Sequence, residues 1–146
     1  MNKQEILTLT KSKVTDKIRY FENLIAETRA SNNDTKSSMG DKYETGREML
    51  QQEINNLQRQ LNEALNQQEM LRKITADSSE KVQHGALVKT DKGLFYIAAS
   101  IGEIVAENHK IMTVSIESPL VKAMFGKKIG DTFTINNINQ NIEDIW

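Results

Sequence analysis

Residues 50–71 read LQQEINNLQRQLNEALNQQEML, and their apolar spacing decides the fold of the first half of the chain. Apolar residues recur at alternating steps of four and three, with one polar break at Gln68; the positions are Leu50, Ile54, Leu57, Leu61, Ala64, Gln68 and Leu71. This alternation is the seam of a coiled-coil helix, because it keeps one narrow apolar stripe on a single face. The spacing predicts a long helix from about residue 41 to residue 74.

A second seam lies closer to the amino terminus, at Val14, Ile18, Phe21, Ile25 and Thr28. The two seams are separated by residues 31–40, SNNDTKSSMG, whose side chains favour caps and turns over helix interiors. Two helices joined by such a loop are expected to pack antiparallel as a thin finger with solvent on nearly all sides. On the heptads alone, a coiled coil that serves only for self-association is an equally good interpretation.

The second half of the chain is rich in turns. Residues 1–80 contain two glycines and no proline, whereas five glycines and Pro119 fall in the remainder. Alternating apolar patterns predict strands at 86–90, 94–99, 103–106, 111–116, 132–135 and 141–145. Ser118 as N-cap, Pro119 at the first helical position and Gly126 at the end predict one short helix.

The predicted fold class is therefore α+β, an antiparallel coiled-coil hairpin followed by a small antiparallel sheet with one short helix. The boundaries we expect are 1–74 for the finger, with its tip at about 31–46, 75–83 for a linker, and 84–146 for the sheet domain.

Composition excludes several functional classes. Nineteen basic and twenty acidic residues leave a net charge of −1, so any contact with nucleic acid must be local. The absence of cysteine excludes disulfides, thiolate zinc sites and cysteine nucleophiles, and it fits a reducing compartment. No signal-peptide pattern and no apolar run of about 18 residues is present. We expect a cytoplasmic protein without a membrane partner.

Asp41 and Glu44 are the main candidates for chemistry. Three residues apart at the start of the second predicted helix, they fall on one helix face, close enough to share a cation. Acidic residues in a first helical turn also cap the helix and favour its dipole, so spacing alone leaves a purely structural role open. Two carboxylates hold Mg²⁺ weakly, because this ion keeps several waters and needs further oxygen ligands. A metal role therefore requires a partner that completes the site.

Two segments resemble the Gre transcript-cleavage factors of bacterial RNA polymerase. Residues 114–131, VSIESPLVKAMFGKKIGD, are similar without a gap to the family's strand, Ser-Pro, short helix and Gly-Lys-x-x-Gly-Asp signature. Residues 40–44, GDKYE, followed by Glu48 and Glu53, are similar to the family's Gly-Asp-x-x-Glu tip motif. The resemblance covers residues 40–135 and extends to the first helix only through the architecture.

This resemblance implies an FKBP-like sheet domain that docks on RNA polymerase through the signature positions Ser118, Pro119, Gly126, Gly130 and Asp131. It also implies that Asp41 and Glu44 share a Mg²⁺ ion with the polymerase and act at the 3′ end of nascent RNA. The free protein would hold no cofactor, would be a monomer, and would not be an enzyme by itself.

The chain departs from the family pattern at the tip. Thr45 and Gly46 stand where the family motif has Asn and Ala, and the segment 31–39 is longer and more polar than the usual connection. Two other interpretations therefore stay open: a Gre-like occupant of the polymerase secondary channel that regulates without cleavage, and a coiled-coil structural or adaptor protein.

Overall fold

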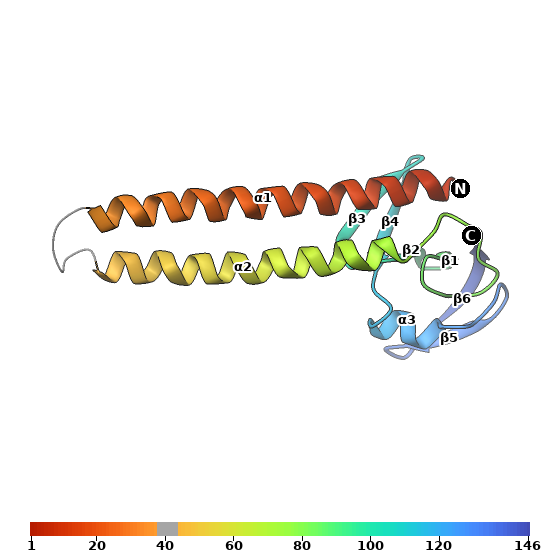
Figure 1. The fold of residues 1–146 in the computed structure, drawn as a ribbon. Helices are drawn as coiled ribbons and strands as arrows, with labels where there is room; N and C mark the ends of the chain where they lie inside the picture. Colours follow the sequence, from red (N-terminus) through yellow and green to blue (C-terminus); the bar gives the residue numbers. More distant parts are fainter. Residues whose placement is uncertain (38–43) are drawn as a thin grey trace. The chain divides into compact units, whose positions relative to one another are not determined.

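The computed structural model describes residues 1–37 and 44–146, with side chains described for residues 1–31 and 46–146. The chain divides into two compact units. The globular unit comprises Met1–Lys13 and Gln67–Trp146, and the finger unit comprises Val14–Asn66. The α+β class predicted from the sequence is confirmed, with two long helices followed by a six-stranded sheet and one short helix (Figure 1).

The finger unit consists of two antiparallel helical segments. Helix α1 spans Lys3–Ser37 and helix α2 spans Glu44–Arg72. A cluster of Phe21, Ile25, Ile54 and Leu57 joins the two helices, with Leu24 and Leu61 packed against it. The predicted seams therefore meet as expected. The predicted start of the loop, at residue 31, is wrong, because residues 31–37 continue α1. Intrinsic helix propensity is only a weak guide. Each residue added to an existing helix gains a backbone hydrogen bond, which favours continuation.

The seam of α2 also shifts near its end. Gln67 is buried at 7% exposure, whereas Gln68, the expected seam position, is half-buried. In the globular unit, the Gln67 Nε2 amide donates to the Ser100 carbonyl at 3.1 Å. Burial here follows contact with the sheet region, which a coiled-coil repeat does not encode.

The sheet has the strand order β3-β4-β2-β1-β6-β5. The strands are β1 (Leu87–Thr90), β2 (Gly93–Ile97), β3 (Gly102–Ala106), β4 (His109–Val114), β5 (Thr132–Ile135) and β6 (Ile138–Ile145). Neighbouring strands pair antiparallel except β2 and β4, which run parallel. The parallel pair was not predicted; it arises because β3 lies at the edge and β4 returns beside β2.

Two tight hairpin turns carry residues in the left-handed region. Glu107 and Asn108 connect β3 to β4 with φ of 52° and 64°, and Asn136 and Asn137 connect β5 to β6 with φ of 53° and 63°. Positive φ at both central positions defines a type I′ turn, for which asparagine is well suited. The Asn-Asn turn starts β6 at Ile138, three residues before the predicted strand.

One face of the sheet forms the main core of the globular unit. Its buried members are Val82, Ala86, Val88, Ile97, Val121, Met124, Phe133, Ile142 and Ile145. Val82 lies in the segment 75–83, so that segment contributes directly to the core.

Tyr96 is fully buried, yet its hydroxyl has no hydrogen-bond partner among the described residues. Burial raises the pKa of Tyr96 to about 12, because the ionised phenolate is poorly solvated there.

The first turns of α1 are fastened to the rest of the globular unit by lysines. The buried Lys3 ammonium donates to the Asp77 carbonyl, and Lys13 donates to the Glu103 carbonyl. Burial lowers the pKa of Lys3, and the charge of Asp77 partly opposes that shift. None of the helices in the described part of the chain is long and apolar enough to cross a membrane.

Candidate functional site

The signature segment 114–131 begins with a capped helix. Helix α3 spans Pro119–Met124, and the Ser118 hydroxyl accepts a hydrogen bond from the Val121 amide at 3.2 Å. Pro119 occupies the first turn, where the missing amide hydrogen leaves no bond unmade. Val121 and Met124 are fully buried and anchor α3 to the core. The predicted N-cap and helix start are thus confirmed.

The turn after α3 is held from both sides by backbone hydrogen bonds. The Gly126 amide donates to the Val82 carbonyl and the Val82 amide donates to the Lys127 carbonyl, both at 2.8 Å. Further along, the Gly130 amide donates to the Ile142 carbonyl at 2.8 Å. Gly126 and Gly130 adopt φ of +80° and +91°, which a residue with a Cβ adopts only under strain.

Asp131 closes this turn. One of its carboxylate oxygens accepts from the Lys128 amide at 2.8 Å, and its own amide donates to the Lys128 carbonyl at 3.0 Å. The five predicted docking residues, Ser118, Pro119, Gly126, Gly130 and Asp131, therefore shape one local structure. Each has a role in backbone geometry, and their contact with a polymerase stays a prediction.

Two of the side chains that this structure presents to solvent are large and apolar. Phe125 and Ile129 are both 56% exposed, and we call them the apolar turn. Lys122 and Lys128 are exposed in the same segment. Single exposed apolar side chains are common on soluble proteins, so the place of these two within the signature segment is what makes them candidates for an interaction surface. The sequence motif drew attention to the glycines and the aspartate. The available signal for Phe125 and Ile129 was an apolar residue directly before each of the two turn glycines, outside any helical or strand period.

The acidic tip pair falls largely outside the described residues. Asp41 is among residues 38–43, which the structure does not describe, and Glu44 is the first residue of α2 with its side chain outside the described set. The shared face of Asp41 and Glu44 stays a prediction. Among the described side chains, no group of three or more His, Asp or Glu is placed to hold a metal ion.

Comparisons with known proteins give structural likeness at low identity. No protein-family model and no curated protein matches the chain. The crystal structure of GreA factor homolog 1 (Gfh1) of Thermus thermophilus is similar with 15% identity and a TM-score of 0.40, over 93% of this chain and 94% of that one. A structure of the transcription factor Gfh1 has 14% identity and a TM-score of 0.39, over 92% and 90%. The crystal structure of Thermus aquaticus Gfh1 has 16% identity and a TM-score of 0.38, over 93% of each chain. At these values, the chain's own motifs and geometry are the basis for functional inference.

Proposed function

We propose that this chain is a Gre-like transcription factor that binds bacterial RNA polymerase through its globular unit and inserts its finger into the secondary channel. The observation that carries the proposal is the signature segment 114–131, whose Ser118 cap, paired glycines and Asp131 fold a turn that leaves Phe125 and Ile129 exposed. The acidic motif at residues 40–44 supports it, because this motif follows α1 in the sequence and ends at Glu44, the first residue of α2. The part of α2 that belongs to the finger unit, residues 44–66, is about 35 Å long, and a long narrow element of this kind suits entry into a channel.

The proposed chemistry is hydrolysis of backtracked RNA within the polymerase. Asp41 and Glu44 would supply carboxylate oxygens to a Mg²⁺ ion that the polymerase also ligates. When bound, such an ion would supply a water of lowered pKa for attack on the RNA phosphorus and would stabilise the leaving oxygen, and Asp41 and Glu44 would serve to hold and orient it. Neither partner contains the complete site, so the factor stimulates cleavage and is not an enzyme alone.

The cleavage role is tested in a stalled polymerase complex with Mg²⁺. We expect the wild-type factor to shorten the RNA, and the double variant Asp41→Ala/Glu44→Ala to lose at least about 100-fold of that stimulation. The matched control is Asp16→Ala/Glu22→Ala, which removes two exposed carboxylates from α1. This variant should stimulate cleavage as well as the wild type does. Full stimulation by the tip variant would exclude the acidic pair from the chemistry.

The docking role is tested separately by co-elution with polymerase. Phe125→Ser/Ile129→Ser should weaken binding about 100-fold, because burial of each large apolar side chain contributes on the order of 1.5–3 kcal/mol. The control Val105→Ser/Ile138→Ser removes two apolar side chains of similar exposure, 60% and 50%, elsewhere on the globular unit. Equal loss in both variants would contradict a specific docking surface at the apolar turn.

A second candidate is a channel regulator that acts without cleavage. Gly46, which replaces the family's Ala, favours this function. A Cβ at this helical position would meet nothing within 4 Å, so packing does not require the glycine. A glycine lowers helix stability relative to alanine, here next to the acidic pair that cleavage would need. Inhibition of nucleotide addition without shortened RNA would select this function. A structural or adaptor role is selected if the chain fails to co-elute with polymerase and forms a concentration-dependent dimer.

A further inference from the structure

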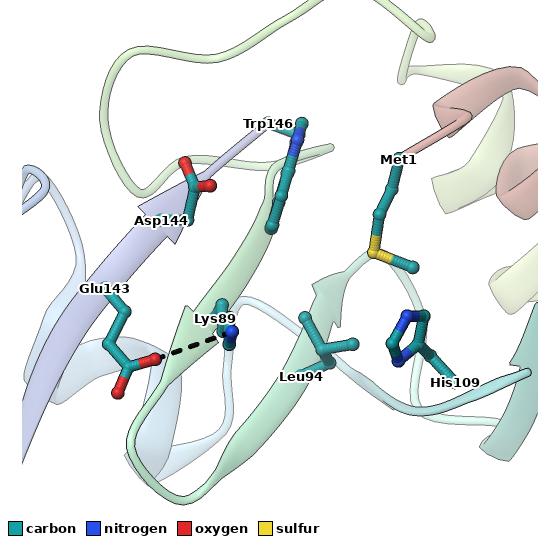
Figure 2. A pocket seen from close by; sticks show the side chains of 7 residues that line it. All are labelled: Met1, Lys89, Leu94, His109, Glu143, Asp144 and Trp146. Carbon is teal, nitrogen blue, oxygen red and sulfur yellow. Dashed lines mark ion pairs between the residues drawn. The ribbon is translucent and has the colours of Figure 1, made fainter. Parts of the chain in front are cut away.

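A half-open pocket of about 400 Å³ lies on the globular unit and shares no residue with the signature segment (Figure 2). Its apolar wall comes from three separate elements: Met1 before α1, Leu94 in β2 and Trp146 after β6. Its polar wall comes from Lys89, Glu143 and Asp144 on the paired strands β1 and β6, and from His109 at the start of β4. A concave site with an apolar wall and a few converging polar groups is the usual setting for recognition of a ligand side chain.

Trp146 is held in place by its backbone. Its amide donates to the Leu87 carbonyl at 2.8 Å, and its carbonyl accepts from the Leu87 amide at 3.1 Å. These two bonds extend the pairing of β1 with β6 by one residue and fix the position from which the indole projects. The ring is half-buried, so part of its π surface is open to the pocket.

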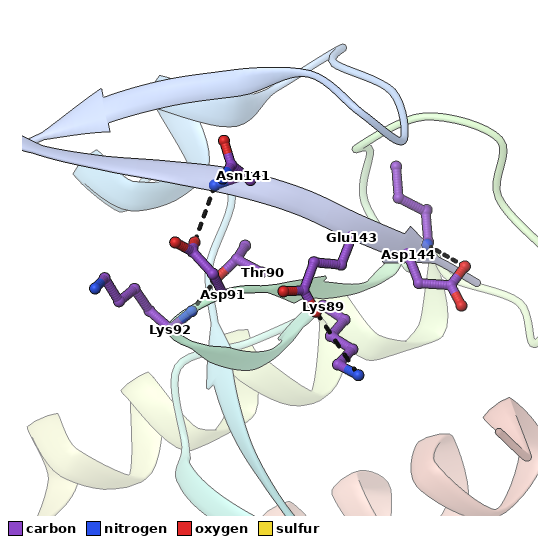
Figure 3. Close-up of polar contacts among 8 residues, drawn as sticks. Lys89, Thr90, Asp91, Lys92, Asn141, Glu143 and Asp144 are labelled. Atoms are coloured by element: carbon purple, nitrogen blue, oxygen red, sulfur yellow. Dashed lines mark hydrogen bonds and ion pairs between the residues drawn. The ribbon is translucent and has the colours of Figure 1, made fainter.

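The charges of the pocket leave one carboxylate uncompensated. Lys89 and Glu143 form an ion pair at 3.7 Å, with side chains 52% and 45% exposed. Asp144 is half-buried, and its Oδ1 atom accepts only from the amide of the next residue, Ile145, at 2.9 Å (Figure 3). Within the described part of the chain, no cationic side chain pairs with Asp144. Because Lys89 is paired with Glu143, Asp144 is the carboxylate with which a positively charged ligand group can pair.

We propose that this pocket binds the guanidinium group of an arginine side chain on a partner protein. A flat guanidinium stacks on an indole face and presents its N–H groups in the plane of a carboxylate, so Trp146 and Asp144 satisfy it together. Met1 and Leu94 supply apolar surface for the aliphatic stem of the arginine. A lysine ammonium fits less well, because it lacks the planar set of N–H donors. An anionic group is disfavoured, because Glu143 and Asp144 would repel it. This inference does not depend on the polymerase proposal.

Trp146 is the single tryptophan of the chain, so its fluorescence reports on this pocket alone. Titration of the full chain with Nα-acetyl-arginine amide should change the emission saturably, whereas the citrulline analogue, which has nearly the same shape without the charge, should not. Asp144→Asn should weaken the arginine compound about tenfold, the factor for one charge-assisted hydrogen bond. The control Asp16→Asn removes the same charge from the finger unit and should bind as the wild type does. No saturable change, or equal affinity in wild type and Asp144→Asn, overturns the proposal.

A second variant keeps the test independent of Asp144. Lys89→Gln removes the cation that competes with the ligand and releases Glu143, so the arginine compound should bind several-fold more tightly. Unchanged or weaker binding to a folded Lys89→Gln variant contradicts the proposal. A short peptide with a central arginine should bind at least as tightly as the amide. Preference for free arginine, with its own ammonium and carboxylate, would overturn the assignment to a protein partner.

Discussion

The globular unit and the finger unit bury the same kinds of side chain to different depths. In the described part of the chain, twelve large side chains are less than 2% exposed, and Val14, at the boundary, is the one that belongs to the finger unit. The cluster of the finger unit keeps between 4% and 8% of each side chain in water. A single stripe between two helices cannot close over its own edges. The finger unit is therefore expected to open locally more readily than the sheet of the globular unit.

The largest expected difference is in the loss of stability when the same isoleucine-to-alanine truncation is made in each unit. Ile142, in the main core, is 1% exposed, and Ile54, in the finger cluster, is 5% exposed. We expect Ile142→Ala to lower the free energy of unfolding by about 4 kcal/mol and Ile54→Ala by about 2 kcal/mol, because the finger can relax into the space left behind. Urea unfolding followed by circular dichroism measures both values.

Hydrogen exchange locates each effect. Ile54→Ala should accelerate amide exchange in residues 14–31 and 46–66 and leave the sheet protected, whereas Ile142→Ala should accelerate exchange in all strands. Equal losses of stability with the same exchange pattern would mean that the two units unfold as one.

The sequence was sufficient where one local rule governs the structure. The Ser118 cap with Pro119 defined the start of α3, and alternation placed β5 at its observed bounds. The sequence was insufficient where contacts with residues far along the chain determine burial or strand pairing. Gln67 replaces Gln68 in the seam because Ser100, far along the chain, accepts its hydrogen bond, and β4 runs parallel to β2 because β3 takes the edge.

The candidate site divides in the same way. Spacing identified the turn residues of the signature, since glycine and aspartate have local backbone roles. It could not identify Phe125 and Ile129 as exposed, because exposure depends on how α3 packs against the core. For Asp41 and Glu44, spacing gives a shared helix face and nothing about the groups that a partner would add.

Two tyrosines extend the comparison to alkaline pH. Tyr96 is fully buried in the globular unit, and Tyr20 is 59% exposed in the finger unit. The folded-state pKa of Tyr96, about 12, lies above its value in the unfolded chain, about 10, so stability is retained below pH 10 and falls as pH rises towards 12. Tyr96→Phe should remove up to about 2 kcal/mol of this fall.

Unfolding of Tyr96→Phe and of the control Tyr20→Phe between pH 9 and pH 12 tests this expectation. Tyr20→Phe should follow the wild-type curve. At neutral pH, Tyr96→Phe should change stability by less than about 1 kcal/mol, because the hydroxyl that it removes has no partner in the described structure. Wild-type alkaline behaviour in Tyr96→Phe would indicate that the phenol is solvated in the folded protein.

Glycine substitutions give the smallest effects, and their signs should be opposite. Gly130 has φ of +91° and open space around the position of a Cβ, so Gly130→Ala is strained by backbone conformation alone and should cost about 1–2 kcal/mol. Gly46 lies in the first turns of α2, also with open space, so Gly46→Ala should stabilise the helix by up to about 1 kcal/mol. Thermal unfolding distinguishes a lowered Tm from a raised one. If Gly46→Ala stabilises the chain and also raises RNA cleavage in the stalled complex, pliability at the start of α2 limits how well the acidic pair is positioned. If it stabilises the chain and abolishes cleavage, the finger requires that pliability, and Gly46 is itself a functional position.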